Sequence, residues 1–121
     1  MRAGRLQRNQ ENNFVMTESE YNRHVDETLL AIEEAIDASG ADIDYENAGG
    51  VLTLYFGDGS QIILNRQTPV RQLWVAARDN GHHFDFDDAA GAWVRDRDAA
   101  PLLAVLEEAA SRQAGENVAL R

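Results

Sequence analysis

Cysteine is absent from the 121-residue chain, and so is lysine, because all eleven basic residues are arginine. Without cysteine, the chain has no disulfides, no thiolate metal sites and no cysteine nucleophiles. This suits a reducing compartment, although secreted domains can also lack cysteine. No apolar run approaches the ~20 residues of a membrane span, and no signal-peptide core is found. With 44% hydrophobic residues, a chain of this length is predicted to form one globular domain.

The familiar motifs of catalytic sites are also missing. The sequence has no G-x-S-x-G elbow, no phosphate-binding P-loop and no H-E-x-x-H zinc motif. Pairs of carboxylates are present, but they fall on surface that is predicted to be exposed. Acid–base catalysis usually needs a desolvated carboxylate. We therefore expect a binding protein rather than an enzyme.

Negative charge dominates the composition and is concentrated in one segment. The net charge is −10, which argues against nucleic acid and anionic membranes as partners. It favours metal cations or a basic protein surface. Residues 16–46 contain ten acids, with Arg23 as their only base. This quarter of the chain therefore carries nearly all the net charge and is the first candidate for a functional surface.

Two amphipathic helices enclose a run of short strands in the predicted fold. Residues 1–15 show no useful period and are expected to be a disordered leader or a cloning remnant, so that the domain proper spans residues 16–121. Helical spacing predicts a helix over residues 17–38, with an apolar stripe made of Tyr21, Val25, Leu29, Ile32 and Ile36. A second helix is predicted to begin at Asp98 as its N-cap, with Pro101 in its first turn.

Between the helices, the hydrophobic period changes from helical to alternating. The alternation predicts six strands, over residues 42–46, 51–56, 61–66, 73–77, 82–86 and 92–95. Short turns such as Gly57–Ser60 imply that the strands pair antiparallel. The core is completed by Leu102, Leu103, Leu106 and Ala110 of the second helix and by Val118 and Leu120 of the tail. The expected fold class is α+β: a two-layer sandwich with a six-stranded antiparallel sheet, two terminal helices on one face and the other face open.

The acids of the first helix align in two rows away from its apolar stripe, and those of the first strand share one strand face. These three sets are Asp26, Glu33 and Asp37; Glu20, Glu27 and Glu34; and Asp42, Asp44 and Glu46. A solvated face that keeps a small protein soluble is one interpretation. The density of like charge favours a functional surface instead. Oxygen ligands suit hard cations such as Fe³⁺, Mg²⁺, Ca²⁺ or Mn²⁺ in a shallow, weak site, and the same acids could dock an arginine-rich protein.

The alternation also predicts which side chains point away from the helices. They are Thr53, Tyr55, Ile63, Asn65, Trp74, Ala76, His83 and Asp85, with Gln67 just past the third strand. An outward tryptophan is typical of interface hot spots. It could equally pack across strands against Asn65 or His83. The pair His82–His83 cannot easily chelate a metal, because neighbouring residues of a strand point to opposite faces.

Several stretches of the chain are similar to one known family. They are Asn47–Leu54, Asp58–Ser60, Ile63–Pro69, Gln72–Ala76, Gly81–Asp85 and Gln113–Glu116. The most specific is the run Asn-Arg-Gln-x-Pro-x-x-Gln-x-Trp, which begins at Asn65. On these residues the chain from Met16 to Arg121 resembles the frataxin family, and most closely its bacterial, CyaY-type branch.

The resemblance implies an α-β sandwich and a function in iron–sulfur cluster assembly in the bacterial cytoplasm. It implies iron, Fe²⁺ or Fe³⁺, bound weakly at the surface of a protein that is monomeric without metal. It also implies docking on the cysteine desulfurase and on the cluster scaffold protein. The metal ligands of the family's acidic ridge map onto Asp26, Glu27, Glu33, Glu34, Asp37, Asp42 and Asp44. Its partner contacts map onto Glu33, Asp37, Asp44, Asn65, Gln67, Trp74 and His83.

Two other interpretations of the same residues stay open. One is a pure protein-interaction module whose weak metal binding is incidental. The other is an iron-oxidising enzyme, for which the sequence shows no dedicated centre. Uncharged residues over 38–41 stand where bacterial relatives often carry further acids, so the ridge should be thinner than is usual in the family.

Overall fold

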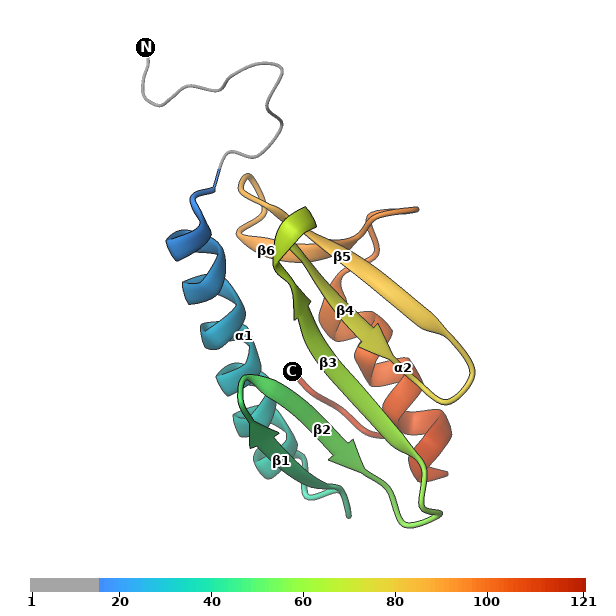
Figure 1. The fold of residues 1–121 in the computed structure, drawn as a ribbon. Helices are drawn as coiled ribbons and strands as arrows, with labels where there is room; N and C mark the ends of the chain where they lie inside the picture. Colours follow the sequence, from blue (N-terminus) through green and yellow to red (C-terminus); the bar gives the residue numbers. More distant parts are fainter. Residues whose placement is uncertain (1–15) are drawn as a thin grey trace.

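Two helices and a six-stranded sheet are formed by residues 16–121, the part of the chain that this computed structural model describes (Figure 1). The elements in chain order are α1 (Glu18–Ser39), β1 (Asp44–Ala48), β2 (Val51–Tyr55), β3 (Gln61–Gln67), a 3-10 turn η1 (Thr68–Val70), β4 (Gln72–Ala76), β5 (Gly81–Asp87), β6 (Ala92–Arg95) and α2 (Leu102–Ala114). The predicted leader over residues 1–15 lies outside the described residues. This order of elements confirms the predicted α+β fold.

Helix α1 begins at a capping box. The Thr17 hydroxyl accepts from the backbone N–H of Glu20 at 3.0 Å, and the Glu20 carboxylate accepts from the backbone N–H of Thr17 at 2.9 Å. Two amides that the helix itself leaves unpaired are thereby satisfied. Gly40 ends the helix in the left-handed conformation, with φ of 73°. The five residues of the predicted apolar stripe are at most 2% exposed, so the acids between them face solvent.

Consecutive strands pair antiparallel, in the sheet order β1-β2-β3-β4-β5-β6. The short turns between them allow this arrangement without any crossover. Helices α1 and α2 lie on one face of the sheet, and the opposite face is open (Figure 1). No helix within residues 16–121 is long and apolar enough to cross a membrane.

Strand β1 lies two residues later than the sequence predicted. The prediction was residues 42–46, whereas the strand is Asp44–Ala48. Gly49 and Gly50 both have positive φ, at 63° and 82°. They form a tight two-residue turn, so the ladder with β2 continues as far as the turn itself. Asp42 therefore precedes the strand instead of sharing its alternating face.

Helix α2 also begins later than predicted, and Asp98 is not its cap. The first helical residue is Leu102, and Pro101 takes the N-cap position without a side-chain hydrogen bond. The N–H of Arg95 donates to the carbonyl of Ala100 at 2.8 Å, and a β-bridge between Val94 and Pro101 continues this pairing. The segment before the helix is thus held extended against β6. The Asp98 carboxylate accepts from the Arg95 guanidinium at 2.8 and 3.0 Å instead, which lowers the pKa of Asp98 to about 2.

The core lies between the helices and the sheet. The tail residues Val118 and Leu120 are buried in it, as predicted, at 2% and 3% exposure. Leu103, which was predicted to complete the core, is only half-buried. The reason is its position at the margin of the helix layer, where it lines a groove between the two helices together with the half-buried Phe86.

Candidate functional site

The seven acids that the resemblance assigns to metal lie along α1, in the segment after it and at the start of β1. We call them the acidic ridge: Asp26, Glu27, Glu33, Glu34, Asp37, Asp42 and Asp44. Glu33 is half-buried, and the other six are exposed. Helix α1 holds the first five at the surface because its apolar stripe is buried against the sheet. Gly40 ends the helix, and Asp42 and Asp44 follow within a few residues. Hydrogen-bond partners distinguish three groups within this ridge.

Two acids in the N-terminal part of the ridge have arginine partners. Asp26 Oδ1 accepts from Arg66 Nη2 at 2.6 Å, and the same guanidinium donates to Asn22 Oδ1, which ties α1 to β3. Glu27 lies 3.5 Å from Arg23, one helical turn earlier, and both side chains are exposed. Such an exposed pair contributes little. Asp26 is therefore the ridge acid least available to an added cation.

Two acids in the middle of the ridge accept hydrogen bonds from uncharged groups of β1. Glu33 Oε2 accepts from Asn47 Nδ2 at 3.0 Å, and Asp37 Oδ2 accepts from the Tyr45 hydroxyl at 2.8 Å. The bond to Asp37 raises the pKa of Tyr45, because it stabilises the neutral phenol. These contacts fix the carboxylates against β1 but leave their negative charge uncompensated.

The carboxylates of three ridge acids, Glu34, Asp42 and Asp44, make no hydrogen bond or ion pair with any other residue of 16–121. Together with the two acids bound to β1, they leave five negative charges in the C-terminal part of the ridge. No arginine within the described residues pairs with any of them. A positive ligand would meet the least competition here.

The ridge is not a preformed metal cage. No group of three or more histidine, aspartate or glutamate side chains within residues 16–121 is arranged to hold a metal ion. The donors are all carboxylate oxygens, which fit hard cations. A cation at this surface would gather its ligands from solvated side chains and keep much of its water.

Trp74 and His83 stack on the open face of the sheet. Their ring centroids are 4.2 Å apart and their planes 22° apart, because the two residues lie directly opposite each other on β4 and β5. Asn65 lies opposite Trp74 on the other side, and these residues line a shallow hollow of about 180 Å³. Gln67 is half-buried at the end of β3. The Trp74 ring packs across the strands, as one of its two interpretations predicted, and it is half-exposed. Its role at an interface stays a prediction.

Gln72 and Asp96 belong to the same surface, although the sequence analysis did not single them out. The indole Nε1 of Trp74 donates to Gln72 Oε1 at 2.9 Å, and Gln72 Nε2 donates to Asp85 Oδ1 at 3.1 Å. Asp96 Oδ2 lies 3.8 Å from Nδ1 of His83. Alternation along β4 could have indicated Gln72, which lies two residues before Trp74. No pattern indicated Asp96, because it follows the end of the last strand.

The other two histidines serve packing. His24 stacks on Phe86, with ring centroids 4.0 Å apart. His82 is 6% exposed at the core margin, and burial together with the nearby charge of Arg95 lowers its pKa. As the sequence predicted, His82 and His83 point to opposite faces of the sheet and do not converge on one ion.

Comparison with known proteins identifies the family. The sequence profile of the frataxin-like domain matches residues 14–116, which is most of the chain. The chain belongs to the frataxin family. The resemblance seen in the sequence is thereby confirmed, and the two-layer arrangement of Figure 1 is the frataxin fold.

Curated relatives in the frataxin family are similar over nearly their whole length. The iron–sulfur cluster assembly protein CyaY of Pseudomonas aeruginosa is 50% identical over 103 residues, which cover 85% of this chain and 95% of that protein. CyaY of Vibrio cholerae is 46% identical over 103 residues, covering 85% and 97%.

Solved frataxin structures have the same fold. Frataxin from Psychromonas ingrahamii superposes with a TM-score of 0.81 at 40% identity, covering 88% of this chain and 99% of that one. Trimeric frataxin from the yeast Saccharomyces cerevisiae, complexed with ferrous iron, superposes with a TM-score of 0.61 at 26% identity, covering 88% and 94%. The bacterial structure is therefore the more similar of the two.

Proposed function

We propose that this protein is an iron-binding adaptor of iron–sulfur cluster assembly in the bacterial cytoplasm, and that it is not itself an enzyme. The bacterial relatives named above are cluster assembly proteins, and a yeast relative has been solved with ferrous iron. The observation that carries the proposal is the uncompensated charge of the C-terminal part of the ridge. Five carboxylates lie there without a cationic partner among the described residues, which is a costly arrangement unless a positive ligand uses it.

Iron is the cargo in this proposal, and Glu33, Glu34, Asp37, Asp42 and Asp44 are its ligands. Carboxylate oxygens are suitable donors for Fe²⁺ and Fe³⁺. Because no cage is preformed within the described residues, binding is weak and each ion keeps bound water. Asp26 and Glu27 contribute less, since each has an arginine beside it. A surface of this kind can load and release an ion without a conformational change.

Partner proteins use two surfaces in this proposal. The ridge, through Glu33, Asp37 and Asp44, meets a basic patch of the cysteine desulfurase, where opposite charge speeds association. The open sheet face, through Asn65, Gln67, Trp74 and His83, meets the scaffold protein. A half-exposed tryptophan beside amides is typical of an interface hot spot. The protein is a monomer before metal is added, since its charge of −10 disfavours self-association.

A second candidate is a pure protein-interaction module with incidental metal binding. The observation that favours it is the same lack of a metal-holding cluster within residues 16–121. On this alternative, the ridge serves only to dock a basic partner, and the weak, incidental binding of iron does not depend on the ridge acids.

The triple variant Glu33→Gln, Glu34→Gln and Asp37→Asn separates the two candidates. Anaerobic calorimetry with Fe²⁺ and surface plasmon resonance with purified cysteine desulfurase measure the two kinds of binding independently. The matched control is Asp88→Asn, Glu108→Gln and Glu116→Gln, which removes the same number of negative charges from exposed positions elsewhere on the domain.

The proposed adaptor loses both kinds of binding in the triple variant and keeps both in the control. If desulfurase binding is lost while the iron titration is unchanged, the pure interaction module is correct. If neither kind of binding changes, the ridge has no function in either role. Weakening of equal size in both triple variants would mean that net charge alone, and not the ridge, attracts the ligands.

A further inference from the structure

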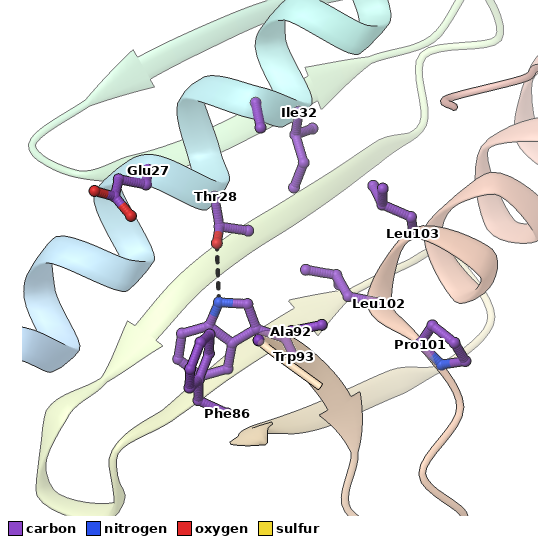
Figure 2. A pocket seen from close by; sticks show the side chains of 11 residues that line it. Glu27, Thr28, Ile32, Phe86, Ala92, Trp93, Pro101, Leu102 and Leu103 are labelled. Carbon is purple, nitrogen blue, oxygen red and sulfur yellow. Dashed lines mark hydrogen bonds between the residues drawn. The ribbon is translucent and has the colours of Figure 1, made fainter. Parts of the chain in front are cut away.

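An apolar groove runs between the two helices, on the side of the molecule opposite the open sheet face. It has a volume of about 290 Å³ and is bounded by α1, β6 and the start of α2. Figure 2 shows Trp93 and Phe86 at one end, with Leu102 and Leu103 across from them. Trp93 Nε1 donates to the hydroxyl of Thr28 at 2.9 Å. The polar atom of the indole is therefore satisfied, and its ring presents an apolar wall.

Small residues keep this groove open. Ala31 of α1 lines it and is exposed, and Gly91 and Ala92 line it from the β5–β6 side. A helix packed tightly on its neighbours would bury a larger side chain at the position of Ala31. The result is a concave apolar surface flanked by two aromatic rings, which fits an apolar side chain of leucine size.

Acids flank the opening of the groove along α1. Glu27, Ala31 and Glu34 follow one another at i, i+4 and i+7, so they share one stripe of the helix. Glu27 itself lines the groove and has only the exposed contact with Arg23 at 3.5 Å. Glu34 has no partner among residues 16–121. The groove is thus an apolar depression beside two negative charges, of which Glu34 is unpaired and Glu27 has only a weak, exposed ion pair.

We propose that this groove binds an amphipathic, basic segment of a partner protein. A leucine-like side chain of that segment enters between Trp93 and Leu103, and an arginine or lysine beside it pairs with Glu27 and Glu34. Charge complementarity selects this occupant. A fatty acid or an anionic lipid would bring its negative head toward Glu27, and a second copy of the chain would bring a charge of −10 toward a surface of the same sign.

The groove adds an apolar binding surface that neither surface of the proposed function contains. It lies on the helix side, whereas Trp74 and its neighbours lie on the open sheet face. It requires no metal, although its two flanking acids, Glu27 and Glu34, also belong to the acidic ridge. A partner that bound here would therefore recognise apolar side chains and charge together, which the ridge alone cannot do.

Substitution of Ala31→Phe tests the proposal, because it fills the groove without removing a contact or a charge. The matched control is Leu30→Phe, which places the same ring at a neighbouring exposed position that does not line the groove. The probe is a short amidated peptide of leucine and arginine, with its leucines on one helical face. A second peptide has serine in place of every leucine. The readout is the ¹⁵N NMR spectrum of the full chain, in which the indole N–H of Trp93 is one of two tryptophan signals.

The leucine–arginine peptide should shift the Trp93 indole signal of the wild-type protein. It should bind Ala31→Phe about tenfold more weakly than wild type, which is the loss expected when one leucine side chain stays in water. Its affinity for Leu30→Phe should stay within about twofold of wild type. Glu27→Gln should weaken this peptide by a few-fold. The serine–arginine peptide should leave the Trp93 signal in place and bind Ala31→Phe and wild type alike.

An unmoved Trp93 signal at saturating leucine–arginine peptide would overturn the proposal, and so would equal affinity for Ala31→Phe and wild type. Tighter binding of dodecanoate than of this peptide would assign the groove to a fatty acid instead. Ala31→Phe keeps every carboxylate, so its iron titration should match that of the wild type. Failure of the groove proposal is thereby distinguishable from failure of the iron proposal.

Discussion

The hydroxyl of Tyr45 donates a hydrogen bond of 2.8 Å to Oδ2 of Asp37, and this contact joins strand β1 to the last turn of helix α1. Asp37 lies where the helix dipole disfavours an anion. The phenol partly offsets this disadvantage without neutralising the charge. The carboxylate is thereby held in place at the centre of the ridge and stays available to a cation.

Asp37→Asn should lower the pKa of Tyr45 toward its ordinary value of 10.0, because the neutral phenol loses its charged acceptor. A pKa that is raised in the folded state stabilises the protein below the unfolded value, and this contribution is lost as pH rises through the folded pKa. The variant should therefore lose less stability than wild type as the pH rises above about 10. Titration of ¹³Cζ-labelled tyrosine by NMR measures the shift directly.

Tyr55 supplies an internal control for this titration. Its hydroxyl donates to Glu46 Oε1 at 3.0 Å, and that bond raises the pKa of Tyr55 independently of Asp37. The Tyr55 signal should titrate alike in Asp37→Asn and wild type. An unchanged midpoint for Tyr45 would show that Tyr45 and Asp37 are not hydrogen-bonded in solution.

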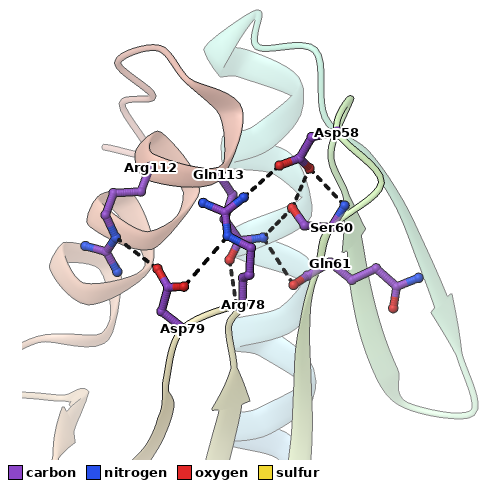
Figure 3. Close-up of polar contacts among 7 residues, drawn as sticks. All are labelled: Asp58, Ser60, Gln61, Arg78, Asp79, Arg112 and Gln113. Atoms are coloured by element: carbon purple, nitrogen blue, oxygen red, sulfur yellow. Dashed lines mark hydrogen bonds and ion pairs between the residues drawn. The ribbon is translucent and has the colours of Figure 1, made fainter.

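Gln113 of α2 hydrogen-bonds to the loop between β2 and β3 and to the loop between β4 and β5 (Figure 3). It is 6% exposed, its Oε1 accepts from the N–H of Arg78 at 2.9 Å, and its Nε2 donates to Ser60 Oγ at 2.9 Å and to the carbonyl of Gln61 at 3.2 Å. Gln113→Met keeps the volume but leaves these groups unpaired, so urea unfolding should show a loss of about 1–3 kcal/mol. Gln61→Met is the matched control. Its exposed side chain has no part in these bonds, and a loss of the same size there would contradict this account.

The main elements of the fold were predictable because their signals are local. The stripe from Tyr21 to Ile36 predicts α1, and the turn signals between alternating segments predict an antiparallel sheet. The error at the start of α2 arose because other nearby pairing competed with the expected helix cap. Aspartate is a typical N-cap residue, but the carboxylate of Asp98 is ion-paired with Arg95. The carbonyl of Ala100 accepts a backbone hydrogen bond from Arg95 of β6. A single sequence does not reveal such competition.

The location of the acidic residues in the candidate site was predictable from the sequence, but their ion-pair and hydrogen-bond partners were not. Charge counting and helical spacing located the ridge acids on one side of α1. The ion pair of Asp26 with Arg66 joins residues forty positions apart, and no local pattern indicates it. The same holds for the groove beside Trp93, because α1 forms one of its walls and is distant in sequence from the β5, β6 and α2 residues that form the others. The division of the ridge into paired and unpaired acids is therefore a result of the structure alone.

Ala99 has a φ of 61° in the turn between β6 and α2, and this left-handed conformation is unfavourable for a residue with a Cβ atom. Ala99→Gly should therefore raise the free energy of unfolding by about 0.5–1 kcal/mol, after the greater freedom of glycine in the unfolded chain is subtracted. Ala90→Gly is the control, since Ala90 is an exposed turn residue without a positive φ. It should be neutral or destabilising. Thermal unfolding measures the stability of both variants. A melting temperature below that of wild type for Ala99→Gly would contradict the claim that Ala99 is strained in this turn.

Trp74→Ala should weaken binding of the scaffold protein more than it weakens the fold. The side chain is half-buried and packs mainly on His83, so its removal should cost about 1–3 kcal/mol, less than the loss of a fully buried tryptophan. Trp74→Phe is the companion variant. It retains an aromatic ring to stack on His83 but loses the indole N–H that donates to Gln72.

Urea unfolding and binding to purified scaffold protein should be measured on both tryptophan variants. Trp74→Phe should be close to wild type in stability, because its ring still packs on the sheet. Its affinity for the scaffold should be intermediate, because the indole N–H that orients Gln72 at the proposed interface is lost. Trp74→Ala should bind at least about tenfold more weakly, as expected when an interface anchor is truncated. A large loss of stability with scaffold binding retained would mean that Trp74 serves cross-strand packing alone, and the sheet face would then have no role in docking.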